Sequence, residues 1–244
     1  MKHVALILAR SGSQSIPDKN IFPINGTPLI GYCLKVVDSC DFLDEIWVST
    51  NDNHIANISR SFSPRVQIHF RPETESGNDC SSLKSVKNFL STHEVSGAIY
   101  LIQCTSPCLN KIYLKQAFDL ISCGSWNSVF SVTKSHHLRW SPKIDCGVMP
   151  VNFDPAARPR RQDWPGELVE SGHFYVTKNS VIFEKNLLQC SEKSTIVEIP
   201  SCMSLELDEP WQIPFVELMV KLYYEIPIQT SGPKGREDEL MGQV

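Results

Sequence analysis

The sequence predicts an α/β protein with a doubly wound, mainly parallel sheet. The first observation is an unbroken apolar run, residues 4–9, which is typical of a parallel strand that is covered on both faces. The second is the alternation of strand and helix patterns over roughly the first half of the chain, as expected of β-α-β units. The third is a polar, glycine-bearing turn, residues 10–20, at the end of the first strand, where α/β sheets bind their ligands.

The alternation can be followed element by element. Strands are expected at 4–9, 45–49, 66–70 and 98–103, and helices at 29–37, 52–62, 81–90 and 109–121. Asp52 is placed to cap the second of these helices. Leu83, Val86, Phe89 and Leu90 fall on one face of the third. Crossovers between the parallel strands are expected to be right-handed.

The alternation ends near residue 135. Residues 135–171 contain five prolines and are predicted to be irregular, too long for a bare connection unless they are functional or reach a partner subunit. A chain of 244 residues is ordinary for one α/β domain, which we assign to residues 1–225. Residues 226–244 are expected to form a flexible tail because they are rich in Gly, Pro and charge.

Composition excludes several classes of protein. A net charge of -4, with 41% hydrophobic and 20% charged residues, is typical of a globular enzyme and not of a nucleic-acid-binding protein. No apolar run approaches the ~20 residues that span a bilayer. Nine cysteines without a C-x-x-C pair indicate reduced thiols. Met1 leads directly into the first strand without a cleavable signal, which favours the nucleus or cytoplasm, while two N-x-S/T sequons, at Asn25 and Asn57, leave the Golgi lumen open.

The turn after the first strand is expected to bind a polyanion. Arg10 and Lys19 supply cations, and backbone N–H groups are free to point at the ligand. The turn matches neither G-x-G-x-x-G nor G-x-x-x-x-G-K-[ST], which disfavours the dinucleotide fold and the P-loop. The competing interpretation is an ordinary β-to-α connection with two solvated cations.

This turn resembles the amino-terminal signature of the sugar-activating cytidylyltransferases, above all the animal CMP-sialic acid synthetases, which reads R-G-G-S-K-G-I-P-x-K-N. The residues that match are Arg10, Gly12, Ser13, Ile16, Pro17, Lys19 and Asn20. Ser11, Gln14 and Ser15 depart from the pattern. Because Ser15 stands where the family has Gly, backbone strain is expected there.

Further matches extend to about residue 213. Residues 47–52, 101–107 and 127–133 resemble three strand ends of the family, with Asn51 in place of its usual Asp. Residues 152–164, N-F-D-P-A-A-R-P-R-R-Q-D-W, are similar to the animal pattern N-P-A-K-R-P-R-R-Q-D-W, in which the Arg-rich stretch also serves nuclear import. On these motifs the chain is identified as a member of the family, with the catalytic domain alone represented.

The resemblance implies a nucleotide-diphospho-sugar transferase-like fold and the transfer of CMP from CTP to a sialic acid, with release of pyrophosphate. Such a reaction depends on charge neutralisation and in-line positioning. The resemblance also implies a divalent metal, Mg²⁺ or Mn²⁺, and a homodimer or dimer of dimers in which residues 135–171 form a protruding arm that completes the neighbour's site. Two alternatives remain open: a cytidylyltransferase for another 2-keto sugar acid, and a catalytically silent nucleotide-binding or interaction protein.

The resemblance assigns residues to four roles. Those expected to act in catalysis are Lys19, Arg160 and Arg161. Those expected to bind the nucleotide are Arg10, Ser13, Asn20, Arg71, Ser81, Ser82 and Gln103, the two serines belonging to the segment 79–82. Those expected to bind the sugar acid are Gln103, Arg158, Gln162, Phe174 and Tyr175. The metal ligands are Glu206 and Asp208.

Several of these residues also have structural interpretations. The segment 79–82 could be a helix N-cap, Asn20 a turn residue, and the arginines of the arm a solvated basic loop. Phe174 and Tyr175 alternate along a strand, so only one is expected to face the ligand, and His173 is expected to be structural. The family's metal-binding Asp-x-Asp aligns with residues 204–206, where Ser204 replaces the first Asp. Glu206 and Asp208 are expected to share one face of a strand and bind a hard cation.

Overall fold

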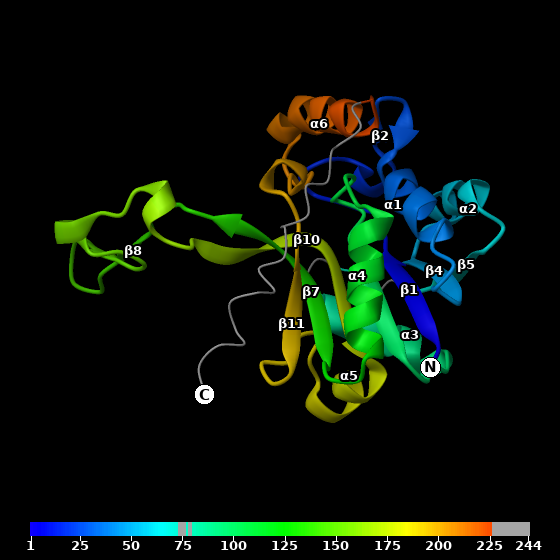
Figure 1. The fold of residues 1–244 in the computed structure, drawn as a ribbon. Helices are drawn as coiled ribbons and strands as arrows, with labels where there is room; N and C mark the ends of the chain where they lie inside the picture. Colours follow the sequence, from blue (N-terminus) through cyan, green and yellow to red (C-terminus); the bar gives the residue numbers. More distant parts are fainter. Residues whose placement is uncertain (73–76, 78–79, 226–244) are drawn as a thin grey trace.

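A seven-stranded sheet with helices on both faces forms the body of the protein (Figure 1). The computed structural model of the chain describes residues 1–72, 77 and 80–225, so Asp79 and the expected tail 226–244 lie outside the described part. The strand order is β11-β7-β10-β6-β1-β4-β5. Strand β10 is antiparallel to its neighbours β6 and β7, while the other paired strands of the sheet are parallel. The predicted doubly wound, mainly parallel fold is therefore confirmed.

The elements follow one another in the order that the patterns predict, with several additions. The strands are β1 His3–Leu8, β2 Pro23–Ile24, β3 Thr27–Pro28, β4 Glu45–Thr50, β5 Val66–Phe70, β6 Ala98–Ile102, β7 Ser128–Ser135, β8 Trp140–Pro142, β9 Val148–Pro150, β10 Glu167–Lys178 and β11 Ser194–Glu198. The α-helices are α1 Leu29–Asp38, α2 Asn53–Phe62, α3 Ser82–Thr92, α4 Lys111–Ser122, α5 Asn179–Lys185 and α6 Ile213–Glu225. Short 3₁₀ helices are η1 Lys19–Ile21, η3 Pro155–Ala157, η4 Arg161–Asp163, η5 Ser201–Met203 and η6 Pro210–Gln212.

Strand β1 lies at the centre of the fold because both of its faces are covered. Leu6 pairs with Trp47 of β4 on one side and with Leu101 of β6 on the other. Residues 4–7 have no exposed surface. Ala5 and Ile7 belong to one buried cluster with residues of α1, α4 and α6, whereas Val4 and Leu6 belong to a second cluster with residues of α3 and α5. The polar turn that follows β1 is thereby held at the carboxyl edge of the sheet.

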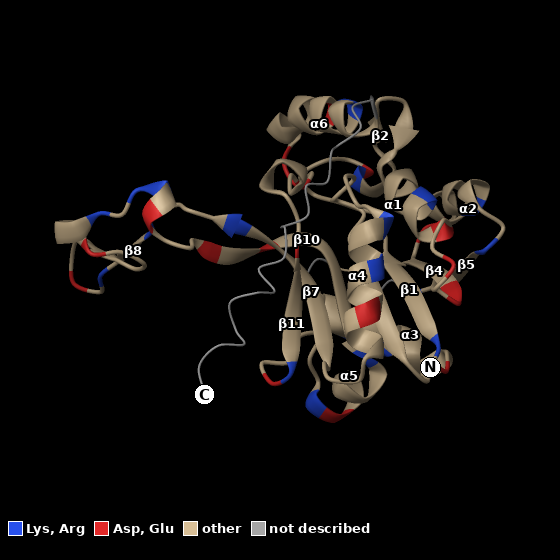
Figure 2. Cartoon of the chain, viewed as in Figure 1, with Lys and Arg blue, Asp and Glu red and all other residues tan. Residues whose placement is uncertain are grey.

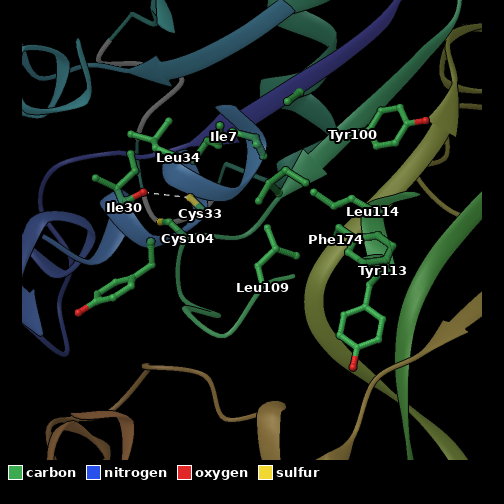
Figure 3. Close-up of a cluster of buried hydrophobic side chains, with 14 of the residues drawn as sticks. Ile7, Ile30, Cys33, Leu34, Tyr100, Cys104, Leu109, Tyr113, Leu114 and Phe174 are labelled. Carbon is green, nitrogen blue, oxygen red and sulfur yellow. Dashed lines mark hydrogen bonds between the residues drawn. The ribbon is translucent and has the colours of Figure 1, made fainter. Parts of the chain in front are cut away.

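The larger of the two cores joins residues from distant parts of the chain (Figure 3). It contains Leu34 from α1, Leu114 from α4 and Phe174 from β10, all without exposed surface. The Asp52 cap of α2 is formed as expected, since its Oδ1 accepts from the backbone N–H groups of His54 and Ile55 at 2.6 and 3.0 Å. The predicted helices form because their apolar faces pack into the core and because side chains such as Asp52 cap their first turns.

Residues 135–171, which we call the arm, project from the body (Figure 1). The prediction that this segment is wholly irregular is wrong. Strands β7 and β10 continue to pair outside the body, with Glu167 opposite Ser135, and β8 and β9 form a hairpin near the tip. In the arm these strands are joined by backbone pairing, and neither face of the ribbon is buried in an apolar core. The sequence therefore lacks the apolar pattern from which a strand is predicted. Pro142 and Pro150 are tolerated because each lies on the edge of a two-stranded ribbon.

Two buried histidines make the stability of the fold depend on pH. Burial lowers the pKa of His173 and of His69 to about 4, from an ordinary value of 6.5. In the unfolded chain both bind a proton below pH 6.5, whereas in the folded protein they do so only near pH 4. The unfolded state therefore binds more protons in this interval, and stability falls as the pH is lowered, by up to about 1.4 kcal/mol per pH unit for each group.

We expect the free energy of unfolding, measured with urea between pH 7 and 4.5, to fall less steeply with decreasing pH in His173→Asn than in the wild type. The slopes are compared, not the absolute stabilities, because the substitution also alters packing. His54→Asn is the matched control, since His54 is exposed. Parallel slopes for wild type and His173→Asn would contradict the assignment of a neutral buried imidazole.

Candidate active site

The turn between β1 and η1, residues 9–18, is the first component of the site, and we call it the first loop. Its backbone is tied to the neighbouring strand β4 and to η1: Ser11 N donates to Asn51 Oδ1 at 3.0 Å, and Asn20 Nδ2 donates to the Arg10 carbonyl at 2.8 Å. Gly12 has a φ of +72°, which suits glycine. Ser15 does not have a positive φ, so the expected strain there is wrong; Asp18, at φ 51°, takes the left-handed conformation instead.

Lys19, the first residue of η1, follows the first loop directly and contacts an acidic residue from the far end of the chain. Its Nζ lies 3.0 Å from Asp208 Oδ1, and its side chain is only 18% exposed. Asp208 precedes η6, which leads into α6. The structure thus brings together one expected catalytic residue and one expected metal ligand. The lysine side chain is largely shielded while the aspartate is open to solvent, so this pair is only partly solvated.

Glu206 lies beside this ion pair in a more enclosed position. Its Oε1 accepts from the hydroxyl groups of Thr105 and Ser106, each at 3.3 Å. Burial and the neighbouring Asp208 raise the pKa of Glu206, and the charge of Lys19 partly opposes this effect. Two carboxylates and one ammonium group therefore interact within a small region at the carboxyl ends of β1 and β6.

Gly172 provides the space that Glu206 occupies. It has a φ of +71°, and a Cβ atom at this position would lie 2.1 Å from Glu206 Oε1. The pairing of β10 with β7 shifts register between Glu170 and Tyr175, so Gly172 lies within a β-bulge. The contacts of Glu206 with Thr105, Ser106 and Gly172 did not emerge from sequence reasoning. A glycine just before an apolar strand was the available signal, because it indicates a bulge or a close approach.

The expected strand geometry of the acidic residues is wrong. Residues 204–208 form no strand; β11 ends at Glu198, and Pro200 and the short helix η5 follow. The Ser204 hydroxyl donates to the Pro200 carbonyl at 3.3 Å instead of joining the carboxylates. The backbone N–H of Leu207 donates to the Thr105 carbonyl at 2.9 Å, which anchors the segment between Glu206 and Asp208. A backbone contact, not strand alternation, sets the positions of the two carboxylates.

The two carboxylates fit a divalent cation only in part. Within residues 1–72, 77 and 80–225 no group of three or more His, Cys, Asp or Glu side chains is arranged to hold a metal. Mg²⁺ is commonly held by one or two carboxylates together with water and substrate phosphate oxygens. Glu206 and Asp208 match that donor set, and a cation beside them would also relieve the repulsion that raises the pKa of Glu206.

Of the two aromatic candidates on β10, only Tyr175 remains available for a ligand. Phe174 has no exposed surface and lies in the core (Figure 3), so its assignment to the sugar acid is wrong. Alternation along the strand directs Tyr175 to the other face, where its OH donates to Glu170 at 2.8 Å. Burial raises the pKa of Tyr175, and the hydrogen bond with Glu170 and the charge of Glu206 raise it further.

Gln103 and Ser13 lie near the edge of the sheet, whereas two other nucleotide candidates, Arg71 and Ser81, have structural contacts. Gln103 N donates to the His173 carbonyl at 3.1 Å, and its side chain, like that of Ser13, is partly exposed. Arg71 is buried and donates to Ser85 at 2.7 Å. The Ser81 hydroxyl accepts from Lys84 N at 3.2 Å and so caps α3, as its structural interpretation predicts. Ser82 begins α3 and is exposed.

The arginines of the arm are not brought to the first loop within one chain. Figure 2 shows the basic residues of the arm well away from the carboxyl end of β1. Arg158 stacks over Phe153 at 5.4 Å, and Arg160 makes a two-pronged contact with Asp163 at 2.8 and 3.0 Å. Arg161 lies exposed in η4, as does Gln162. These residues therefore serve a site at the first loop only if it belongs to another copy of the chain.

A lysine beside paired carboxylates at the carboxyl edge of a doubly wound sheet is an arrangement typical of α/β enzymes that bind phosphorylated ligands. The cytidylyltransferase family model matches residues 4–188, and the chain belongs to that family.

Relatives and solved structures agree with this assignment. The chain is 40% identical over 223 residues to N-acylneuraminate cytidylyltransferase A of Danio rerio, covering 90% of this chain and 51% of the relative. It is 42% identical over 186 residues to N-acylneuraminate cytidylyltransferase of Oncorhynchus mykiss, covering 74% and 42% respectively. The chain thus spans about half the length of these relatives. The fold resembles CMP:2-keto-3-deoxy-manno-octonic acid synthetase complexed with CTP, with a TM-score of 0.67, 14% identity and coverage of 90% of this chain and 98% of that chain.

We expect Gly172→Ala to destabilise the protein by about 1–3 kcal/mol, since it adds both backbone strain and a clash with the Glu206 carboxylate. Gly124→Ala is the matched control: Gly124 has a φ of +83° but no heavy atom within 4 Å of the added Cβ. Urea unfolding of both variants, and of the double variant Gly172→Ala/Glu206→Ala, separates the two costs. An equal loss of unfolding free energy in Gly172→Ala and Gly124→Ala would contradict the close contact between Glu206 and Gly172.

Proposed function

We propose that this chain is a CMP-sialic acid synthetase domain, which transfers CMP from CTP to a sialic acid and releases pyrophosphate. The observation that carries the proposal is the 40–42% identity to N-acylneuraminate cytidylyltransferases of two fishes. It is supported by the placement of Lys19, Glu206 and Asp208 beside the first loop. Identity at this level, over most of this chain, is a stronger guide to substrate than the fold, which also serves other cytidylyl transfers.

In the proposed reaction a hydroxyl oxygen of the sugar acid attacks the α-phosphorus of CTP. A new oxygen–phosphorus bond forms, the bond between the α-phosphorus and its bridging oxygen breaks, and the hydroxyl proton is released. The first loop, with Arg10, Ser13 and Lys19, neutralises and orients the triphosphate. Gln103 and Tyr175 face the sugar acid, and Arg71, Ser81 and Ser82 serve the nucleotide from the adjacent edge, Arg71 by supporting Ser85.

The proposal includes a divalent cation held by Glu206 and Asp208. Mg²⁺ or Mn²⁺ at this position supplies charge neutralisation to the triphosphate when it is bound. The residues of the chain have the complementary task of fixing the positions of the two carboxylates, of which Glu206 is partly buried and Asp208 is open to solvent. Thr105 and Ser106 hold one of them by hydrogen bonds, and the ammonium group of Lys19 pairs with the other.

We also propose that the protein acts as a homodimer in which the arm of one chain completes the site of the other. The arm exposes a set of large apolar side chains, as expected of a surface that another chain covers: Trp140, Ile144, Val148, Met149 and Val151. It also carries Arg158, Arg160, Arg161 and Gln162, whose positions suit a phosphate or carboxylate of a neighbouring site. None of the helices in the described part of the chain has the length and apolar character of a membrane span.

We expect the purified chain to release pyrophosphate from CTP only when a sialic acid is present, and to form the CMP-sugar acid, as detected by chromatography. Arg161→Ala should lower kcat by about 10²–10³, the usual effect of removing one charge-assisted contact with the transition state. Lys143→Ala is the matched control, since Lys143 is also an exposed cation of the arm.

Three outcomes contradict parts of this proposal. Turnover of 2-keto-3-deoxy-manno-octonic acid but not of a sialic acid would identify another sugar-acid specificity. CTP binding without turnover of either would indicate a silent nucleotide-binding protein. Equal rates for Arg161→Ala and Lys143→Ala would remove the arm from the reaction.

Site sharing predicts complementation between two inactive variants. In a mixture of Arg161→Ala and Lys19→Ala subunits, mixed dimers contain one site with both residues intact. With random exchange half of the dimers are mixed, so about a quarter of wild-type activity should return. Subunit exchange is confirmed separately by native mass spectrometry. If exchange occurs and no activity returns, both residues act within the same chain.

A further inference from the structure

A single peptide unit of the first loop is fixed from both sides. The peptide between Arg10 and Ser11 presents its carbonyl to Asn20 Nδ2, at 2.8 Å, and its N–H to Asn51 Oδ1, at 3.0 Å. Asn51 Nδ2 also donates to Ser11 Oγ at 3.0 Å. Since both polar groups of one rigid peptide plane are held, its rotation is restricted, and with it the direction in which the following loop amides point.

Asn20 is itself held by a buried thiol. Cys104 Sγ lies 3.0 Å from Asn20 Oδ1, and the two residues are only 2% and 8% exposed. The carbonyl of Arg10 can only accept, so the amide nitrogen of Asn20 must face it, and the amide oxygen must face the thiol. Cys104 is therefore the donor. Burial raises the pKa of Cys104 to about 12, so it keeps its proton at neutral pH.

The nearby Cys33 does not compete for this contact. Figure 3 shows Cys33 and Cys104 close together in the core. The Cys33 thiol donates to the Ile30 carbonyl, at 3.1 Å, within its own helix. The Cys104 thiol is thus directed to Asn20, and the side chain of Asn20 uses its oxygen on the thiol and its nitrogen on the loop backbone.

We propose that Cys104 is a positioning residue for nucleotide binding, acting through Asn20 on the peptide between Arg10 and Ser11. The inference rests on the proposed binding of CTP at the first loop. It also changes the expected role of Asn20, from a direct contact with the nucleotide to the link between β6 and the first loop. A loop with a fixed peptide plane presents its N–H groups to a triphosphate without losing as much conformational entropy on binding.

The test compares three cysteine variants by calorimetric titration with CTP. Cys104→Ala should raise the Kd about five- to tenfold, the effect of losing one hydrogen bond from a buried amide. Cys104→Ser restores a donor and should remain within about twofold of the wild type. Cys108→Ala is the matched control: Cys108 is also 2% exposed and lies on the same segment, and in the described part of the chain its sulfur makes no hydrogen bond.

Hydrogen exchange of the first-loop peptides, measured by mass spectrometry on the protein without ligand, gives a second readout. Exchange should increase in Cys104→Ala but not in Cys104→Ser or Cys108→Ala, and thermal unfolding shows whether the two alanine variants are equally stable. Unchanged CTP affinity and unchanged exchange in Cys104→Ala would overturn the proposal. If the wild type itself does not bind CTP, the proposed function fails, and the exchange comparison alone then decides whether Cys104 holds the loop.

Discussion

The covering of β1 on both faces is the constraint on which the rest of the structure depends. Residues 4–7 have no exposed surface, and helices pack on each side of the strand. The covered residues 4–9 are all apolar, and the polar side chains that follow them, Arg10 and Ser11, occur where the chain leaves the sheet. The neighbouring strands β4 and β6 end at the same edge, and their following residues Asn51 and Cys104 are therefore available to hold the first loop.

Charges meet at this edge from opposite ends of the chain. Lys19 follows the first strand, whereas Glu206 and Asp208 lie shortly before the last described helix. The ion pair of Lys19 with Asp208 offsets part of the repulsion between the two carboxylates, and the hydroxyl groups of Thr105 and Ser106 support Glu206. Partial burial makes these charges sensitive to one another, because solvent screens them less than it screens charges at the surface. Such an arrangement suits the proposed binding of a triphosphate together with a divalent cation.

The arm has a different physical basis from the body. It is held by strand pairing and by polar contacts such as that of Arg139 with Glu167, two hydrogen bonds of 2.7 Å each, while its apolar side chains remain exposed. An element of this kind contributes little to a core of its own. Its exposed Trp140 and Ile144, together with its arginines, are the observations on which the proposed contact with a second copy of the chain rests.

The sequence by itself determined the fold class, most elements of the body, the polar loop after β1 and the family, because these depend on local apolar periodicity and on motifs that are contiguous in the chain. The tertiary structure decided how distant residues meet. It pairs Asp208 with Lys19, brings Glu206 close to Gly172 and joins Cys104 to Asn20 by a hydrogen bond. It also buries Phe174 in the core. It also showed pairing in the arm where apolar patterning predicted none. These three contacts join residues that are 34 to 189 positions apart, and they depend on strand order and on backbone contacts such as that of Leu207 with Thr105. Periodicity within a short segment carries no information about either.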